Sequence, residues 1–244
     1  MYPLSLKNIN QNKRVLALIP ARGGSKGLHR KNILQAAKWP LIAWTITAAH
    51  NSVVIDKLIL SSEDDEIIHI AREWGCEAPF KRPNTLAEDG AKSVDVALHA
   101  LKELPGYEYL ILLQPTSPLR LSRDIDAAFA LMIKHGATSC VSVCEANQSP
   151  YLMYDVEDND RIFGLLAPPK GAHRRQDLPP VYVLNGAIYI TQVDEFLISK
   201  SFINDDTVAY KMSAERSIDI DSSLDFEKFL AYIEANNITE LPLR

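Results

Sequence analysis

Residues 15–32, Val-Leu-Ala-Leu-Ile-Pro-Ala-Arg-Gly-Gly-Ser-Lys-Gly-Leu-His-Arg-Lys-Asn, indicate the fold more strongly than any other stretch of the chain. An apolar run typical of a buried strand breaks at Pro20 and enters a glycine-rich turn. Four cations follow, namely Arg22, Lys26, Arg30 and Lys31. Glycines let backbone N–H groups approach an anion, while guanidinium and ammonium groups neutralise it. The stretch therefore predicts a phosphate-binding loop after a strand of an α/β domain.

The spacing within this loop differs from two common phosphate-binding motifs. A Walker loop is excluded because no glycine stands five residues before a Gly-Lys-Ser/Thr sequence. The dinucleotide fingerprint is excluded because Ser25 occupies the place of its second glycine. The alternative interpretation is an ordinary strand-to-helix connection with solvated lysines.

The distribution of charge favours an anionic ligand at this loop. No acidic residue precedes Asp56, and the formal net charge of the whole chain is −5. The cations of the first 55 residues are Lys7, Lys13, Arg14, Arg22, Lys26, Arg30, Lys31 and Lys38, a local charge of +8. A basic segment in an acidic protein indicates a local polyanionic ligand. A duplex-binding protein is usually basic overall, so we expect no nucleic-acid partner.

Composition places the chain among globular α/β proteins. Its 244 residues are 47% hydrophobic, which is enough for a full core. No run of about 18 apolar residues occurs, so we expect no membrane span, and a secretory pattern is missing at the N-terminus. Cys76, Cys140 and Cys144 cannot all pair within one chain, and the last two have the spacing of small core residues in a strand. A cytoplasmic location is the simplest interpretation.

Alternating periodicities predict a mostly parallel sheet with helices on both faces. The expected strands of the first half are 15–19, 57–61 and 109–113, and the expected helices are 41–50, 65–74, 93–104 and 123–135. Ligands of such sheets lie beyond the carboxyl ends of the strands. The glycine loop, the turn 61–64 and the turn 114–117 all fall there.

The pattern changes after residue 138. Strands are expected at 139–143, 151–156, 161–165 and 181–190, and an irregular loop at 167–180. Loops of this length are often functional. We therefore expect a core formed by 14–144 and 181–240, with a small β-rich insertion at 145–180.

Two aspartates near the C-terminus form the second strong signal. If residues 217–221 form a strand, Asp219 and Asp221 share one face while Ile218 and Ile220 point to the core. Two neighbouring carboxylates repel unless a cation lies beside them. Mg²⁺ suits one or two carboxylates together with substrate phosphates, so this pair predicts a magnesium site, with Mn²⁺ as a substitute ion. A solvated strand edge before a helix is the alternative, and Asp225 has capping-box spacing from Ser222.

The irregular loop contains Arg174 and Arg175. Beside a phosphate loop and a metal pair, these arginines favour an anion clamp, because a guanidinium makes two-point contacts with carboxylates and phosphates. A disposable surface feature is the alternative. None of the six histidines has metal-ligand spacing, so zinc is not expected.

Taken in order, these motifs resemble the CMP-sialic acid synthetases, the acylneuraminate cytidylyltransferases, over about residues 14–226. The matching segments are Ile19-Pro-Ala-Arg-Gly-Gly-Ser-Lys-Gly27, Arg30-Lys-Asn32, Arg82-Pro83, Leu86-Ala-Glu-Asp89, Leu112-Leu-Gln-Pro-Thr-Ser-Pro-Leu-Arg120, Arg174-Arg-Gln-Asp177, Asn185-Gly-Ala-Ile-Tyr189 and Asp219-Ile-Asp221. The sequence departs from the family at 151–154, after Ser149-Pro150, where a lysine of the sugar side is common.

The resemblance implies a Rossmann-like nucleotidyltransferase fold and a role for each motif. Its implied nucleotide site comprises Arg22, Gly24, Ser25, Lys26, Lys31, Asn32, Arg82 and Ser93, with Arg22 and Lys31 as the catalytic cations. Gln114, Arg175 and Tyr189 would face the sugar acid, and Asp219 and Asp221 would hold the metal. The insertion would serve dimerisation, giving a homodimer.

The implied reaction is transfer of CMP from CTP to a nine-carbon 2-keto sugar acid, a nonulosonic acid, with release of pyrophosphate. Sialic, legionaminic and pseudaminic acids all remain open as the acceptor. An eight-carbon acceptor, 3-deoxy-manno-octulosonate, is the nearest alternative. A non-catalytic nucleotide-binding module is another, although it would have little use for Asp219 and Asp221.

Overall fold

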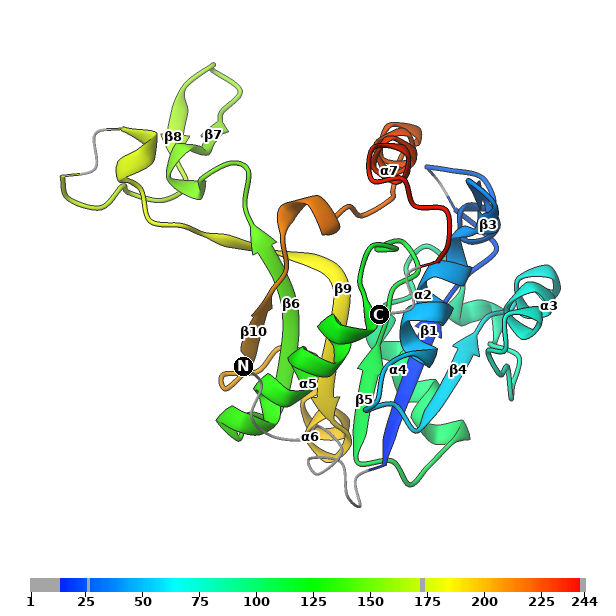
Figure 1. The fold of residues 1–244 in the computed structure, drawn as a ribbon. Helices are drawn as coiled ribbons and strands as arrows, with labels where there is room; N and C mark the ends of the chain where they lie inside the picture. The colour runs from blue at the N-terminus through cyan, green and yellow to red at the C-terminus, as the bar shows by residue number, and fades with distance from the viewer. Residues whose placement is uncertain (1–13, 26, 172–173, 242–244) are drawn as a thin grey trace.

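The computed structural model of the chain describes residues 14–25, 27–171 and 174–241. A six-stranded sheet in the order β10-β6-β9-β5-β1-β4 forms its centre (Figure 1). Its strands are β1 (Val15–Pro20), β4 (Lys57–Ser61), β5 (Tyr109–Leu112), β6 (Ser139–Glu145), β9 (Tyr182–Gln192) and β10 (Val208–Lys211). β1 is parallel to β4 and β5, and β6 is parallel to β10, whereas β9 is antiparallel to β5 and β6. The expected mostly parallel sheet is confirmed.

Helices cover both faces of this sheet. They are α2 (Leu41–His50), α3 (Asp65–Glu73), α4 (Ser93–Glu103), α5 (Ser122–His135), α6 (Val193–Ser199) and α7 (Ser223–Ala235). Short 3-10 helices lie at Lys31–Ile33, Asn84–Leu86, Pro150–Leu152, Arg175–Asp177 and Ala214–Arg216. The helices expected from the sequence begin and end within one residue of the observed bounds. The apolar residues of α3 recur on one face, whereas α2 is apolar and buried almost all round.

The alternation of side chains along β1 explains the two layers. Val15, Ala17 and Ile19 belong to the cluster formed with α2, α3 and α5. Leu16 and Leu18 point the other way, into the cluster formed with α4 and α6. All five side chains are fully buried. A strand buried on both faces is apolar throughout, which is why its sequence shows a continuous apolar run.

A third apolar cluster joins α7 to α2 near the carboxyl end of the sheet. Phe229 of α7 packs edge-on against Trp44 of α2, with ring centroids 5.1 Å apart. Ile220 belongs to this cluster and is fully buried. The predicted capping box also begins α7, because the Ser222 hydroxyl donates to Asp225 at 2.7 Å and accepts from its amide. The cluster and the cap together fix the position of the segment that precedes α7.

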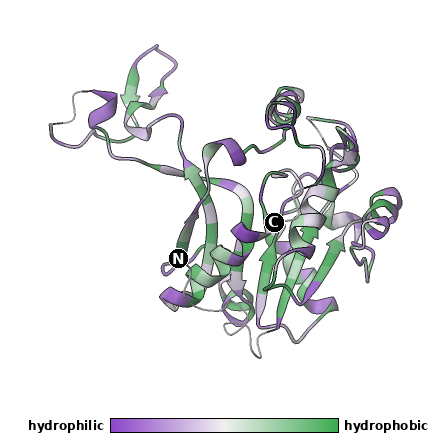
Figure 2. Ribbon diagram, in the orientation of Figure 1, coloured by the Kyte–Doolittle hydropathy of each residue, from purple (hydrophilic) through white to green (hydrophobic). Residues whose placement is uncertain are grey.

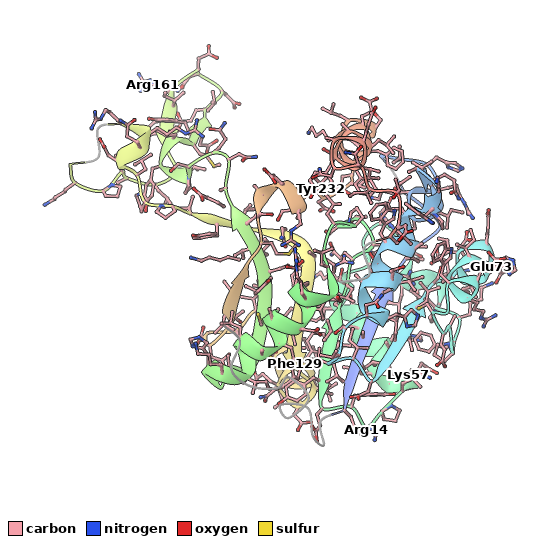
Figure 3. The ribbon with its side chains drawn as sticks, in the orientation of Figure 1. Arg14, Lys57, Glu73, Phe129, Arg161 and Tyr232 are labelled. Atoms are coloured by element: carbon pink, nitrogen blue, oxygen red, sulfur yellow. The ribbon has the colours of Figure 1, made fainter. Side chains whose placement is uncertain are left out.

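Residues 146–171 and 174–181 form an arm that projects beyond the ends of β6 and β9 (Figure 1). It holds the hairpin of β7 (Tyr154–Val156) and β8 (Ile162–Gly164). The strand expected at 151–156 is wrong in its first half, because Pro150 starts a short 3-10 helix there. Figure 3 places Arg161 on the arm, far from the sheet.

Apolar side chains of the arm are exposed rather than buried. Those between 41% and 63% exposed are Leu152, Met153, Tyr154, Val156, Ile162, Phe163, Leu165 and Leu166. Figure 2 shows the corresponding hydrophobic colouring on β8. A contiguous exposed apolar surface of this kind is typical of an interaction site.

The three cysteines lie in the core of the domain. Cys76, Cys140 and Cys144 are buried and free, and burial raises the pKa of Cys140 to about 12. The core position predicted for Cys140 and Cys144 is confirmed, and Cys76 is buried as well. Within the described parts of the chain, no helix combines the length and the apolar character needed to cross a bilayer.

Candidate active site

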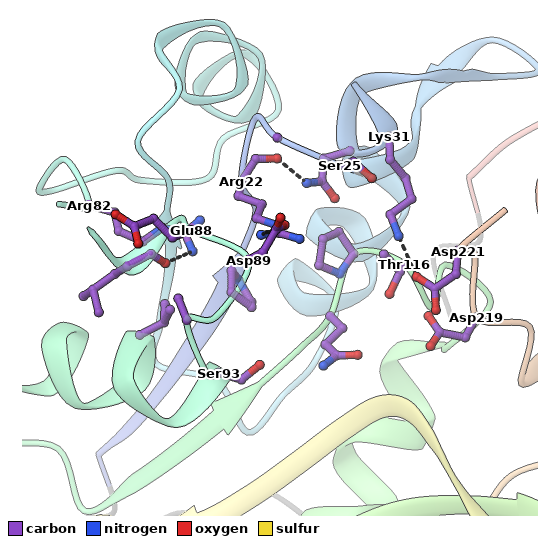
Figure 4. Close-up of a pocket in the computed structure, with 18 residues that line it drawn as sticks. Arg22, Ser25, Lys31, Arg82, Glu88, Asp89, Ser93, Thr116, Asp219 and Asp221 are labelled. Carbon is purple, nitrogen blue, oxygen red and sulfur yellow. Dashed lines mark hydrogen bonds and ion pairs between the residues drawn. The ribbon is translucent and has the colours of Figure 1, made fainter. Parts of the chain in front are cut away.

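A pocket of about 380 Å³ lies beyond the carboxyl ends of β1 and β5 (Figure 4). Its described lining residues are Pro20, Arg22, Gly24, Ser25, Lys31, Asn32, Arg82, Leu86, Glu88, Asp89, Ala91, Ser93, Val96, Gln114, Pro115, Thr116, Asp219 and Asp221. A parallel sheet gathers the loops that follow its strands at this edge. The structure thus brings together ten residues singled out from the sequence, namely Arg22, Gly24, Ser25, Lys31, Asn32, Arg82, Ser93, Gln114, Asp219 and Asp221. Lys26 lies outside the described residues.

The glycine-rich loop is held in a tight arc over the pocket. The Asn32 amide nitrogen donates to the Arg22 carbonyl at 2.9 Å and closes the arc. The Gly23 amide donates to the Glu63 carboxylate at 2.7 Å. Arg30 adopts a left-handed backbone conformation, with φ of 53°, and its guanidinium pairs with Asp64 at 2.6 Å. These contacts anchor the loop to the turn that follows β4.

Two glycines of the loop are required for different close approaches. A Cβ atom on Gly23 would overlap the Asp64 carboxylate, and one on Gly27 would overlap the backbone carbonyl oxygen of Asp221. The phosphate loop and the acidic segment are therefore in backbone contact at Gly27. Gly24 differs, since nothing lies within 4 Å of the place where its Cβ would be.

This difference predicts opposite outcomes for two alanine substitutions. Gly27→Ala should lower the melting temperature by about 3–8 °C, because a backbone carbonyl cannot yield without separating the two segments. Gly24→Ala should leave it unchanged within about 1 °C, since the added methyl group meets open space. Thermal melting followed by circular dichroism checks both. Equal melting temperatures would contradict the contact between Gly27 and Asp221.

Arg82 is the most deeply buried cation of the pocket. Its guanidinium is 4% exposed and donates to the Ser61 carbonyl at 2.8 Å and to the Leu86 carbonyl at 3.3 Å. Burial lowers the pKa of Arg82, and the Glu63 carboxylate, 3.5 Å away, opposes that shift. Its Nε has no hydrogen-bond partner among the described residues, and the same holds for the Asn32 Oδ1. Buried polar atoms without partners at a pocket wall indicate groups waiting for a ligand.

The acidic segment is not the strand that we expected. Residues 217–221 form no ladder, and Ile220 makes a single backbone bond to its neighbours, from its amide to the Thr116 carbonyl at 2.8 Å. The alternation of side chains is nevertheless as predicted, because Ile220 is buried while Asp219 and Asp221 both line the pocket. An extended segment alternates its side chains with or without a partner strand.

A buried polar framework supports the start of the acidic segment and the start of the turn after β5. Arg216 makes a bidentate ion pair with Asp124, whose side chain is only 2% exposed. The Asp124 carboxylate also accepts hydrogen bonds from the Tyr210 hydroxyl at 3.0 Å and from the Leu121 amide at 2.8 Å. Fully buried Arg120 donates to the carbonyls of Gln114 and Ala187, and burial lowers its pKa to about 9.

The two aspartates have different surroundings. The Asp219 residue is exposed as a whole, but protein atoms crowd its carboxylate, and this desolvation raises the pKa of Asp219, with the charge of Asp221 adding to the rise. A hydrogen bond from Thr116 opposes the shift. The Asp221 carboxylate is 75% exposed and accepts from the Lys31 ammonium at 2.8 Å (Figure 4).

The charges that line the pocket nearly cancel. Of its described residues, three are cations (Arg22, Lys31 and Arg82) and four are carboxylates (Glu88, Asp89, Asp219 and Asp221). The basic N-terminal segment is therefore met by acids from distant parts of the chain. In the described residues no group of three or more His, Cys, Asp or Glu side chains could hold a metal by itself. Two carboxylates facing one polyanion site fit an ion that completes its shell with ligand phosphates and water.

The residues expected on the sugar side are not all at the pocket. Gln114 lines it, and Tyr189 lies on β9, where burial and the charge of Asp219 raise the pKa of its hydroxyl. Arg175 lies on the arm instead, donates to the Asn147 carbonyl at 2.7 Å and lines a separate pocket of about 430 Å³. A single chain does not bring Arg175 to the acidic segment.

Three residues of the site lie in matching segments but were given no individual role from the sequence. Asp89 pairs with Arg22 at 3.1 Å, and Thr116 bonds to Asp219. Gly186 has φ of 73°, and a Cβ there would lie 2.8 Å from the Gln114 Oε1. Thr116 lies in the turn 114–117 expected at the carboxyl edge, and Asp89 ends the matching segment 86–89, so these positions were the available signal. The positive φ of Gly186 arises from a bulge in β9 that periodicity does not reveal.

Comparisons with known proteins find relatives along most of the chain. A family model described as cytidylyltransferase matches residues 16–232. N-acylneuraminate cytidylyltransferase of Streptococcus agalactiae is 36% identical over 220 residues, which are 89% of this chain and 53% of that protein. CMP-N,N'-diacetyllegionaminic acid synthase of Legionella pneumophila is 32% identical over 234 residues, 91% of this chain and 97% of that protein. The chain thus spans about half of the first relative and nearly all of the second.

Solved structures show the same fold. A CMP:2-keto-3-deoxy-manno-octonic acid synthetase complexed with CTP superposes with a TM-score of 0.69 at 16% identity, covering 92% of this chain and 100% of that one. The 4-diphosphocytidyl-2C-methyl-D-erythritol synthase of Anaerococcus prevotii gives a TM-score of 0.64 at 13% identity, covering 91% and 99%.

Proposed function

Because the chain belongs to the cytidylyltransferase family, we propose that it transfers CMP from CTP to a nonulosonic acid and releases pyrophosphate. One observation carries the proposal: a single pocket at the carboxyl edge of the sheet joins the glycine loop and Arg22 and Lys31 to the aspartate pair. The names of its relatives support the nine-carbon class of acceptor. We further propose that it works in the cytoplasm, where CTP is made.

The chemistry of the proposed reaction is an in-line displacement. The anomeric 2-hydroxyl oxygen of the sugar acid attacks the α-phosphorus of CTP, a new P–O bond forms, and the bond to the β-phosphate oxygen breaks. The hydroxyl proton leaves to solvent or to a base, and pyrophosphate departs with the bonding electrons. Arg22 and Lys31 bind the phosphates and stabilise the negative charge that grows on the leaving group.

Asp219 and Asp221 are proposed to hold Mg²⁺, with Mn²⁺ as a substitute. The pocket supports this assignment because its carboxylates outnumber its cations among the described residues, so a tetraanionic ligand needs added positive charge. The desolvated Asp219 carboxylate, with its raised pKa, is a group that gains from a nearby cation. When bound, the metal would neutralise the phosphates and orient them.

The two ends of the pocket suggest how the nucleotide lies. Arg82 and Ser93 are at one end and the aspartates at the other, with Arg22 between them (Figure 4). We place the cytidine near Arg82, Ser93 and Asn32, where the Arg82 Nε and the Asn32 Oδ1 have no partner among the described residues and are available to the base and ribose. Gly24 and Ser25, with Lys26, would then line the phosphates.

The sugar acid is proposed to lie between Gln114 and Tyr189, next to the Asp219 carboxylate. Gly186 keeps this space open, since a side chain there would displace the Gln114 amide. Every nonulosonic acid carries a carboxylate beside its reacting carbon, and Arg175 is a suitable partner for it. Because Arg175 lies on the arm, we propose a homodimer in which the exposed apolar arm of one copy brings Arg175 to the pocket of the other.

Mixing two impaired variants tests whether Arg175 acts across a dimer. Arg175→Ala should raise the KM for the sugar acid about tenfold or more and leave CTP binding nearly unchanged. Coexpressed with Asp221→Asn, it should form mixed dimers that contain one intact site, and random pairing restores about a quarter of the wild-type activity. Steady-state kinetics on the mixture is the measurement. No recovery above the two separate variants would place Arg175 in its own chain's site or outside any site.

The function itself is tested by pyrophosphate release. Purified protein with CTP and Mg²⁺ is offered N-acetylneuraminate, legionaminate, pseudaminate and 3-deoxy-manno-octulosonate in turn. Release with a nine-carbon acid, and no release with UTP or ATP, is the expected result. Preference for the eight-carbon acid would move the chain to that class of synthetase, and CTP binding without release with any acid would indicate a non-catalytic module.

A further inference from the structure

A carboxylate occupies the place where the proposed function puts a polyphosphate. Asp89 lies on the loop between the short helix Asn84–Leu86 and α4, and its carboxylate is 3.1 Å from the Arg22 guanidinium. Figure 4 shows the pair in the middle of the pocket, between Arg82 at one end and the acidic segment at the other. The side chains of Arg22 and Asp89 are 35% and 54% exposed, so water reaches both.

The position of this carboxylate is unfavourable for an anion-binding pocket. A triphosphate that approaches Arg22 meets the like charge of Asp89, and a guanidinium already paired with a carboxylate attracts phosphate less strongly. Asp219 and Asp221 face a proposed cation, which accounts for their charge. Asp89 lies on a different loop and faces Arg22 instead, so the metal does not account for it.

We propose that Asp89 is an exchangeable counter-ion of Arg22, which gives way to the polyphosphate of CTP and re-forms the pair when pyrophosphate leaves. The proposal rests on the proposed function. In the empty pocket Asp89 keeps Arg22 extended into the site, next to the Ala87 carbonyl that Arg22 also contacts at 3.3 Å. Exchange is easy because an ion pair with this exposure contributes little free energy. A phosphate offers two oxygens to the guanidinium and carries more charge, so it displaces the carboxylate.

The exchange has a consequence for product release. Pyrophosphate remains attracted to Arg22 after the reaction, and strong retention would slow turnover. A carboxylate that competes for the same guanidinium weakens this retention. Asp89 therefore lowers the affinity for CTP and, at the same time, speeds the release of pyrophosphate.

Calorimetric titration of CTP and of inorganic pyrophosphate into two charge-matched variants tests the exchange. Asp89→Asn removes the competing charge and should tighten the Kd of both ligands about five- to tenfold. Glu88→Gln is the matched control, because it removes the same charge from the preceding residue of the pocket lining and leaves the pair of Arg22 and Asp89 intact. Its gain should be at least about threefold smaller. Cytidine, which has no phosphate, should bind both variants as it binds the wild type.

Steady-state kinetics supplies the second readout. Asp89→Asn should be inhibited by pyrophosphate at several-fold lower concentration than the wild type, with a lower kcat if release limits turnover. Unchanged or weaker binding of CTP and pyrophosphate in Asp89→Asn, or an equal gain in Glu88→Gln, would overturn the exchange. If the wild type binds CTP but the variants give one of these results, only the exchange is overturned and the proposed function stands. If the wild type does not bind CTP, the exchange and the proposed function are both overturned.

Discussion

Asp219→Asn is expected to lower turnover at least about 100-fold at saturating Mg²⁺ and, at the same time, to raise the melting temperature at pH 7. The loss of turnover follows because an amide is a poor ligand for Mg²⁺, and one of the two anionic ligands of the proposed metal is removed. Asp221→Asn should show a comparable loss. Binding of Mn²⁺, followed by electron paramagnetic resonance, should weaken in both variants. Near-normal turnover in both at saturating Mg²⁺ would falsify the metal assignment.

The gain in stability follows from the direction of the pKa shift. Folding raises the pKa of Asp219 above its ordinary value of 3.8, mainly by desolvation and further through Asp221. The ionised carboxylate therefore destabilises the fold at every pH above the folded-state pKa, and the penalty disappears below 3.8, where both states are protonated. Asp219→Asn should melt about 1–2 °C higher at pH 7, a modest gain because solvent screens part of the repulsion. The difference should vanish as the pH falls towards the ordinary aspartate value.

Asp225→Asn is the matched control for this experiment. It removes the same charge four to six residues further along, but from the cap of α7 rather than from the pocket. Its hydrogen bonds with Ser222 and Lys228 lower the pKa of Asp225, so its ionised form stabilises the fold. Asp225→Asn should therefore melt lower, by about 1–3 °C, with turnover nearly intact. Opposite effects of the two substitutions on stability, with turnover lost only in Asp219→Asn, separate a site carboxylate from a structural one.

The layers of the fold were predictable because burial of one or both faces of an element gives its apolar residues a characteristic spacing in the sequence. β1 is apolar on both faces and α3 on one, and each was located from that pattern to within a residue. The acidic segment was wrongly assigned as a strand, because an extended chain alternates its side chains whether or not another strand pairs with it. Whether Ile220 bonds to a neighbouring strand or to the Thr116 carbonyl depends on distant residues. Local periodicity carries no information about that choice.

The charge of the site shows a second limit of sequence patterns. The N-terminal segment is strongly basic in sequence, yet in the fold Arg22 meets Asp89 and Lys31 meets Asp221, 190 residues away. Motifs indicated which residues gather at the carboxyl edge, because that edge is fixed by the topology of the sheet. They did not indicate which of these residues form ion pairs, because a difference of a few ångströms in the position of a loop decides which side chains meet.

Removal of either phosphate-binding cation, Arg22 or Lys31, is expected to have the second large effect on turnover, and its size follows from these ion pairs. Arg22→Ala and Lys31→Ala should each lower the single-turnover rate at saturating CTP about 100-fold, while the Kd for CTP weakens less than about tenfold. In the empty site each cation already has a carboxylate partner, so binding CTP exchanges one ion pair for another and the net gain in affinity is small. The negative charge that develops on the departing pyrophosphate replaces no earlier ion pair. A variant without the cation therefore loses the whole stabilisation of that charge.

Lys57→Ala is the control for general loss of positive charge, since Lys57 pairs with Glu77 away from the pocket at 2.5 Å. It should change neither the rate nor the affinity. Rapid-quench measurement of the CMP-sugar formed in one turnover, together with calorimetry of CTP binding, distinguishes the two quantities. If CTP affinity is lost while single-turnover rates at saturating CTP remain normal, Arg22 and Lys31 serve ground-state binding alone. Because Lys31 also holds Asp221, the double variant Lys31→Ala/Asp221→Asn should be less impaired than the product of the two single losses, as expected for residues that act on the same phosphates.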